Sequence, residues 1–222
     1  MIRRDYLLRM IEEFIAMLSR LASLKRGQMW EQASEVIEQE FQRVLGAGAD
    51  DVLKLSETEL LAHLLKGEPT QAVQQKIFIA ARLLAEAGEA AAARGCQEES
   101  RAFHLKALNL LLDTFPEGDS VDAPAYVPKV EGLLTALAGS PLPPQSQLRL
   151  MQHYESLGEF AKAEDMLFAL IEPEPLEPGL VQFGLQFYRR LEGKTDAALS
   201  AGNLPRPEVE AGAAELRRRI PA

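Results

Sequence analysis

Apolar residues recur at helical spacing along most of this chain. Between residues 3 and 25 they return every three or four positions, with charged residues on the opposite side, which is typical of an amphipathic helix. Shorter apolar runs predict one helix after the capping-box pattern Ser56-Glu-Thr-Glu59, another within 180–191, and a last one over 206–219. The helical spacing predicts further helices at about 29–45, 70–93, 97–114, 125–137, 145–157 and 160–171.

Glycine and proline separate these predicted helices. Gly27, Gly46 and Gly95 each follow one of them, and the second half is broken at Gly139-Ser-Pro-Leu-Pro-Pro144. Strong helix formers dominate the regions between the breaks, whereas β-branched residues are scarce. The pattern predicts an all-α fold of about ten helices, arranged as stacked antiparallel α-hairpins.

The length of 222 residues suits a single helical domain that spans residues 1–222. A polar loop at 115–122 interrupts the helical pattern near the middle of the chain. This loop marks possible sub-arrays at 1–114 and 123–222.

One predicted turn has the pattern of a tetratricopeptide-repeat corner. It reads Tyr154-Glu-Ser-Leu-Gly158-Glu-Phe160-Ala-Lys-Ala163. Gly158 lets the first helix end, Phe160 is placed to wedge between the two helices, and Ala163 permits their close approach. Such a corner indicates an architecture built for binding.

Partial copies of this corner occur at Trp30/Ala33 and at Gly95/Ser100. The small second-helix positions 33 and 100 are 67 residues apart, close to twice a repeat of about 34 residues, whereas positions 100 and 163 are 63 residues apart, which is short of that, so the period is imperfect. We therefore expect a tetratricopeptide-like right-handed array. A non-repetitive helical bundle is the alternative.

Three segments resemble an uncharacterised family of bacterial proteins described as tetratricopeptide-like. The first is Ile2-Arg-Arg-Asp5-Tyr6-Leu-Leu-Arg9-Met-Ile11-Glu12-Glu-Phe14, the most specific of the three. The others are Leu55-Ser56-Glu-Thr-Glu59-Leu60-Leu61 and Leu204-Pro205-Arg206 with Glu208-Val209-Glu210. The resemblance implies a helical-repeat fold in a bacterial protein and supplies no activity.

Charge and cysteine content restrict the partners and the compartment. Lys and Arg number 24 against 33 Asp and Glu, a net charge of −9, which argues against nucleic acid because phosphate binding needs a basic face. The single cysteine, Cys96, fits a reducing compartment. A charged N-terminus and the lack of about 20 consecutive apolar residues predict neither a signal peptide nor a membrane span. We expect a cytoplasmic protein.

No catalytic, cofactor or metal site is predicted. His63, His104 and His153 have no second His or Cys one turn away, although Glu59 lies one turn before His63. Cys96 precedes a predicted helix without a histidine motif, so we expect a small buried residue rather than a reactive thiol. We predict that the chain is not an enzyme. A site assembled from scattered side chains is the competing hypothesis.

In a tetratricopeptide array the first helices of the pairs line a concave groove. Asn109 and Asn203 lie outside the corresponding positions, so recognition of an acidic peptide tail by an Asn/Lys clamp is not expected. A helix or mixed segment held by apolar and polar contacts is expected instead. The candidate groove residues are Arg82, Ala85, Glu89 and Ala92 from one pair, and Gln145, Leu148, Gln152 and Glu155 from another.

These observations favour a protein-protein interaction module that binds a peptide or partner helix. The alternative is a structural homo-oligomer, because the first helix has an apolar stripe wide enough for two surfaces. Packing inside the monomer is the simpler interpretation of that stripe. The residues that define it are Tyr6, Met10, Phe14 and Met17.

Overall fold

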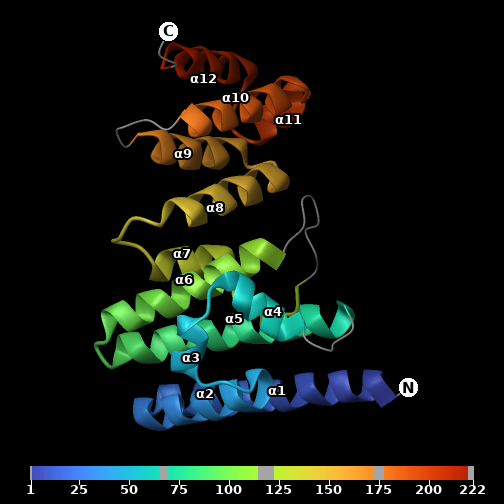
Figure 1. The fold of residues 1–222 in the computed structure, drawn as a ribbon, viewed down its shortest axis with the longest axis vertical. Helices are drawn as coiled ribbons and strands as arrows, with labels where there is room; N and C mark the ends of the chain where they lie inside the picture. Colours follow the sequence, from blue (N-terminus) through green and yellow to red (C-terminus); the bar gives the residue numbers. More distant parts are fainter. Residues whose placement is uncertain (1, 66–69, 115–122, 173–177, 220–222) are drawn as a thin grey trace. The chain divides into compact units, whose positions relative to one another are not determined.

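The computed structural model describes residues 2–65, 70–114, 123–172 and 178–219. These residues form twelve α-helices and no strand, which confirms the all-α class (Figure 1). The helices are α1 (Ile2–Arg26), α2 (Trp30–Leu45), α3 (Ala49–Lys54), α4 (Glu57–Leu65), α5 (Thr70–Ala93), α6 (Gln97–Thr114), α7 (Val130–Ala136), α8 (Pro144–Leu157), α9 (Phe160–Ile171), α10 (Pro178–Glu192), α11 (Asp196–Ala201) and α12 (Arg206–Arg218).

Two helices were not expected from the sequence, and one is shorter than expected. Helices α3 and α11 have six residues each, too few to give a periodic signal. Helix α7 begins at Val130 rather than Ala125, because Pro128 disfavours helical backbone in the residue before it. The segment that precedes α7 turns instead, with the Val127 amide donating to Pro124 O at 2.9 Å.

The described residues divide into two compact units, each treated separately. Unit 1 contains 2–114 and 123–141, and unit 2 contains 142–219. Helix α7 therefore belongs to unit 1. The predicted loop 115–122 lies outside the described residues, and the expected single domain stays a prediction.

Helices α5 and α6 form the central antiparallel pair of unit 1, and α2 packs on α5 while α7 packs on α6. The aromatic rings of Phe41 and Phe103 stack with centroids 6.5 Å apart, which ties α2 to α6. Gly88 lets the two central helices approach, since a Cβ there would lie 2.5 Å from the His104 ring. The predicted bounds of both helices, 70–93 and 97–114, are confirmed.

A buried carboxylate joins α1 to α5 in unit 1. The Glu86 side chain accepts a 2.8 Å bond from Lys25 Nζ and a second bond from Arg82. Lys25 also reaches Glu89. Burial alone would lower the pKa of Lys25, but the bonds to these two carboxylates outweigh it and raise that pKa.

Unit 2 is built from the α8–α9 hairpin and the α10–α12 pair. At the corner predicted between α8 and α9, Gly158 ends α8 with φ 77° as expected, and Phe160 and Ala163 are buried. The ring of Phe160 also touches Gly202 at the end of α11. The Ala161 amide donates to Gly202 O at 3.0 Å, so this corner anchors the next helical segment as well as its own pair.

The same backbone turn occurs at four corners between helices. In each, a residue with positive φ donates to the carbonyl three residues earlier, and the following amide donates to the carbonyl five residues before it. Gly27 was expected to end the first helix, but the left-handed residue at that turn is Gln28. The four residues are Gln28, Gly95, Gly158 and Asn203.

Candidate functional site

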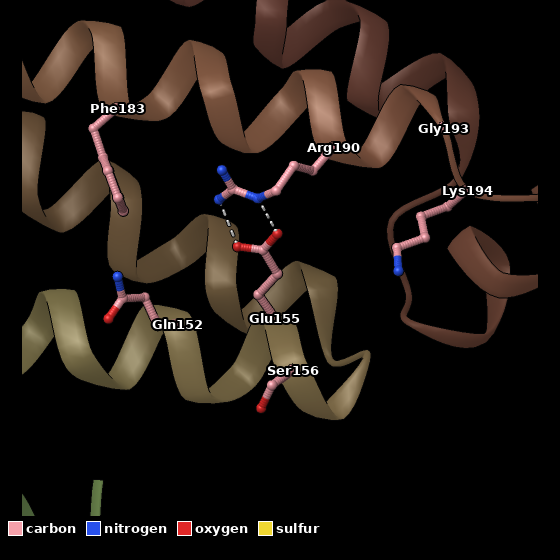
Figure 2. Close-up of a pocket in the computed structure, with 7 residues that line it drawn as sticks. All are labelled: Gln152, Glu155, Ser156, Phe183, Arg190, Gly193 and Lys194. Carbon is pink, nitrogen blue, oxygen red and sulfur yellow. Dashed lines mark hydrogen bonds and ion pairs between the residues drawn. The ribbon is translucent and has the colours of Figure 1, made fainter. Parts of the chain in front are cut away.

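The largest pocket described lies within unit 2, between α8 and α10 (Figure 2). It encloses about 690 Å³ and is open to solvent. Its wall combines an aromatic ring with amide, hydroxyl, carboxylate and cationic groups. The lining residues are Gln152, Glu155, Ser156, Phe183, Arg190, Gly193 and Lys194.

A bidentate ion pair spans the pocket from one helix to the other. Arg190 Nε donates to Glu155 Oε1 at 2.6 Å, and its Nη2 donates to Oε2 at 2.8 Å (Figure 2). The planar guanidinium matches the carboxylate at two points, so this pair fixes orientation better than a lysine would. The pair therefore sets the spacing between α8 and α10 at the middle of the pocket.

The rim at Gly193 and Lys194 is held by a residue from the start of α12. Arg206 Nη2 donates to Lys194 O at 2.6 Å, Nη1 reaches Glu192 O at 3.3 Å, and its Nε pairs with Asp196. Thr195 Oγ1 accepts the Ala198 amide at 3.2 Å and so begins α11 just beyond the rim. The backbone of the rim is thus fixed, while the exposed Lys194 side chain extends from it.

Phe183 and Gln152 form the other end of the pocket. The half-buried ring of Phe183 extends from α10 towards α8, on the side where the Gln152 amide lies (Figure 2). An aromatic surface beside an amide can receive an apolar side chain and bond a neighbouring peptide group. The lining includes no histidine or cysteine, so it holds no nucleophile paired with a histidine base.

The structure distributes the predicted groove residues over both units. Gln152 and Glu155 line the pocket described above, and Gln145 and Leu148 lie earlier on the same helix, outside its described lining. The other predicted residues line a second cavity of about 470 Å³ within unit 1, between α5, α6 and the segment around α7. These are Arg82, Ala85, Glu89 and Ala92.

Sequence reasoning missed Phe183, Arg190 and Lys194. The helix that carries the first two was predicted, but no corner signature follows it at the expected distance. Their order along the chain could have identified them, because α10 follows the α8–α9 hairpin. In a tetratricopeptide array the helix after a hairpin is the first helix of the next hairpin.

Neither the three histidines nor Cys96 is among the residues that line this pocket, although His153 directly follows Gln152 on α8. His63 Nε2 bonds Leu45 O, and His104 is buried with its Nδ1 3.3 Å from Ser100 Oγ. Burial lowers the pKa of His104, and a hydrogen bond with the Ser100 backbone opposes that shift. Cys96 is exposed, so the expectation of a buried cysteine was wrong, because the residue sits where the turn before α6 faces solvent.

Neither a metal cluster nor a membrane span occurs in the part of the chain that the structure describes. Within it, no three His, Cys, Asp or Glu residues gather as metal ligands. No helix among the same residues is long and apolar enough to cross a lipid bilayer.

Comparison with known proteins gives a family but no activity. No curated protein and no solved structure was found to match the chain. The model of a family described as "Family of unknown function (DUF6483)" matches residues 1–220, so the chain belongs to this family.

Proposed function

We propose that the chain is a protein-interaction module of tetratricopeptide-like type, which binds a peptide or partner helix in the pocket between α8 and α10. The observation that carries this proposal is the position of the pocket. It lies between a hairpin's first helix and the helix that follows that hairpin, which is where tetratricopeptide arrays place their binding groove.

The repeated turn geometry supports an array rather than an irregular bundle. The same pair of backbone bonds closes the corners at Gln28, Gly95, Gly158 and Asn203. Such a turn returns the chain antiparallel to the helix before it, which is the unit that stacks in helical repeats. Unequal spacing between the corners fits a diverged array with inserted short helices such as α3 and α4.

The lining predicts the chemistry of the bound segment. Phe183 suits an apolar side chain, and the Gln152 amide suits a backbone peptide group. The Lys194 ammonium has no ion pair among the described residues, so it suits a carboxylate or carbonyl of the ligand. The two asparagines do not form a carboxylate clamp here, because Asn109 is buried and donates to Glu57 at 3.0 Å while Asn203 occupies a turn.

Affinity capture tests the proposal with a matched pair of charge reversals. Lys194→Glu changes an exposed cation at the pocket rim, and Arg189→Glu changes an exposed cation one residue before Arg190 that does not line the pocket. Proteins captured from a cell extract are identified by mass spectrometry, and each is then titrated against the variants. We expect Lys194→Glu and Phe183→Ala to weaken binding about fivefold or more, and Arg189→Glu to leave it unchanged.

Equal capture by the wild type and by both pocket variants would contradict the proposal, as would recovery of small molecules alone. The enzyme hypothesis predicts instead a turnover that is lost on changing His63 or Cys96. Circular dichroism of each variant checks that its helices are intact.

A further inference from the structure

Unit 1 contains a cavity in the same architectural position as the pocket of unit 2. The unit 2 pocket lies between the first helix of a hairpin, α8, and the helix that follows that hairpin, α10. In unit 1 the α5–α6 hairpin is followed by α7, and a cavity of about 470 Å³ lies between α5, α6 and the segment around α7. Its volume is typical of sites that hold a small molecule. The side chains that line the two sites differ, so their ligands should differ.

The floor of the unit 1 cavity is formed by His104, whose side chain is 4% exposed. Its Nδ1 faces Ser100 Oγ at 3.3 Å, whereas its Nε2 has no hydrogen-bond partner among the described residues. Buried polar atoms are normally hydrogen-bonded, so Nε2 is available to a bound molecule. A hydroxyl group suits this atom, because a hydroxyl can donate or accept and therefore matches either tautomer of the imidazole.

Hydrogen-bond donors surround the rest of the cavity. Lys129 is exposed and has no ion pair in the described chain, and the indole N–H of the half-buried Trp30 donates no bond there. Arg82 adds a guanidinium, of which Glu86 engages only Nη2 among the described residues. These groups donate hydrogen bonds and cannot accept them. They therefore suit the oxygens of an anion.

The charge balance favours an anion with a single negative charge. Glu89 is the one acidic residue in the described lining, and it would repel an anion if it were unpaired. Lys25 bonds Glu89 as well as Glu86, so this repulsion is offset. Lys129 is then the cation without a counter-charge. A phosphate monoester would bring close to two negative charges, whereas a carboxylate brings one.

The remaining wall is apolar, with Ala85, Pro128 and Leu133 beside the ring of Trp30. A planar aromatic group can stack on the indole and cover this wall. We propose that the unit 1 cavity binds a small aromatic carboxylic acid that carries a hydroxyl group. The carboxylate bonds Lys129 and the Trp30 indole N–H, and the hydroxyl bonds His104 Nε2.

Trp30 is the single tryptophan of the chain, so tryptophan fluorescence reports on this cavity. Titration of para-hydroxyphenylpropionate into the full chain should give a saturable change, and calorimetry should give the same dissociation constant. The neutral amide of this acid should bind at least about tenfold more weakly, and phenylpropionate about threefold more weakly. A wild type without saturable binding, or equal constants for the acid and its amide, would overturn the proposal.

A leucine at Gly132 tests the location without removing a lining side chain. Gly132 lines the cavity, and a Cβ added there would meet no atom within 4 Å. Gly132→Leu should therefore fill the cavity and abolish binding. Gly179→Leu in unit 2 is the matched control, since its Cβ also meets no atom within 4 Å, and it should bind normally. Unchanged binding by Gly132→Leu would overturn the proposed site.

Three further variants test the contacts, with circular dichroism as the check of folding. Lys129→Gln should weaken binding about tenfold, and Lys54→Gln, an exposed lysine of unit 1 outside this lining, should not. His104→Gln should remove the preference for the hydroxylated acid over phenylpropionate. Equal effects of the two lysine variants, or a preference that survives in His104→Gln, would overturn the assigned contacts. Lys194→Glu should bind the acid normally, which separates this cavity from the pocket of unit 2.

Discussion

Several glycines of this chain stand where a methyl group does not fit. Gly202 is buried at the end of α11, and a Cβ there would overlap the Gly158 carbonyl oxygen and the Phe160 ring. The corner that contains Gly158 and Phe160 therefore depends on a third residue 44 positions further along than Gly158. No feature of the local sequence around Gly202 indicates this contact.

Gly202→Ala should lower the free energy of unfolding by about 2–3 kcal/mol, because neither a backbone oxygen nor a buried ring can move aside cheaply. Urea denaturation followed by circular dichroism measures the change. Gly179→Ala is the matched control in the same unit, since no atom lies within 4 Å of its added Cβ. A control that destabilises as much as Gly202→Ala would show that the close contact is not the cause.

The buried imidazole of His104 should make stability depend on pH. Burial lowers its folded-state pKa below the ordinary value of 6.5, so the unfolded chain binds the proton more readily. The stabilisation that neutral His104 contributes is fully present above pH 6.5, and it is lost as the pH falls through the lowered folded-state pKa. His104→Gln should reduce the slope of the unfolding free energy against pH below pH 6.5. An unchanged slope would show that His104 is not the titrating group.

At the scale of elements, most helices could be predicted because their signals are local. The capping box before α4 forms as expected, with the Glu59 amide 3.2 Å from Ser56 Oγ and the Ser56 amide 2.8 Å from Glu59 Oε2. The Ser56 amide, and after it the Ser56 hydroxyl, lowers the pKa of Glu59 by donating a hydrogen bond to its carboxylate. The turn at Gln28 could not be predicted in the same way, because a residue other than glycine takes positive φ there once the two helices pack.

The position of α1 on unit 1 depends on a carboxylate that is almost fully buried. Glu86→Gln should cost about 2–3 kcal/mol, because the amide leaves Lys25 and Arg82 without their shared negative partner. Hydrogen exchange should rise along α1 more than along α6. Lys54→Ala provides a control, since its pair with Asp51 is 74% and 69% exposed and should contribute little. Equal effects of the two variants would contradict the bridging role of Glu86.

At the scale of the molecule, the candidate site could be predicted only in part. Gln152 and Glu155 were identified because they lie on the first helix of the one clear corner. Arg190 and Phe183 were not, because the sequence does not fix which helix packs beside α8 or with what register. Their position depends on tertiary contacts such as Gly184, whose absent Cβ makes room for Leu216 and Leu167.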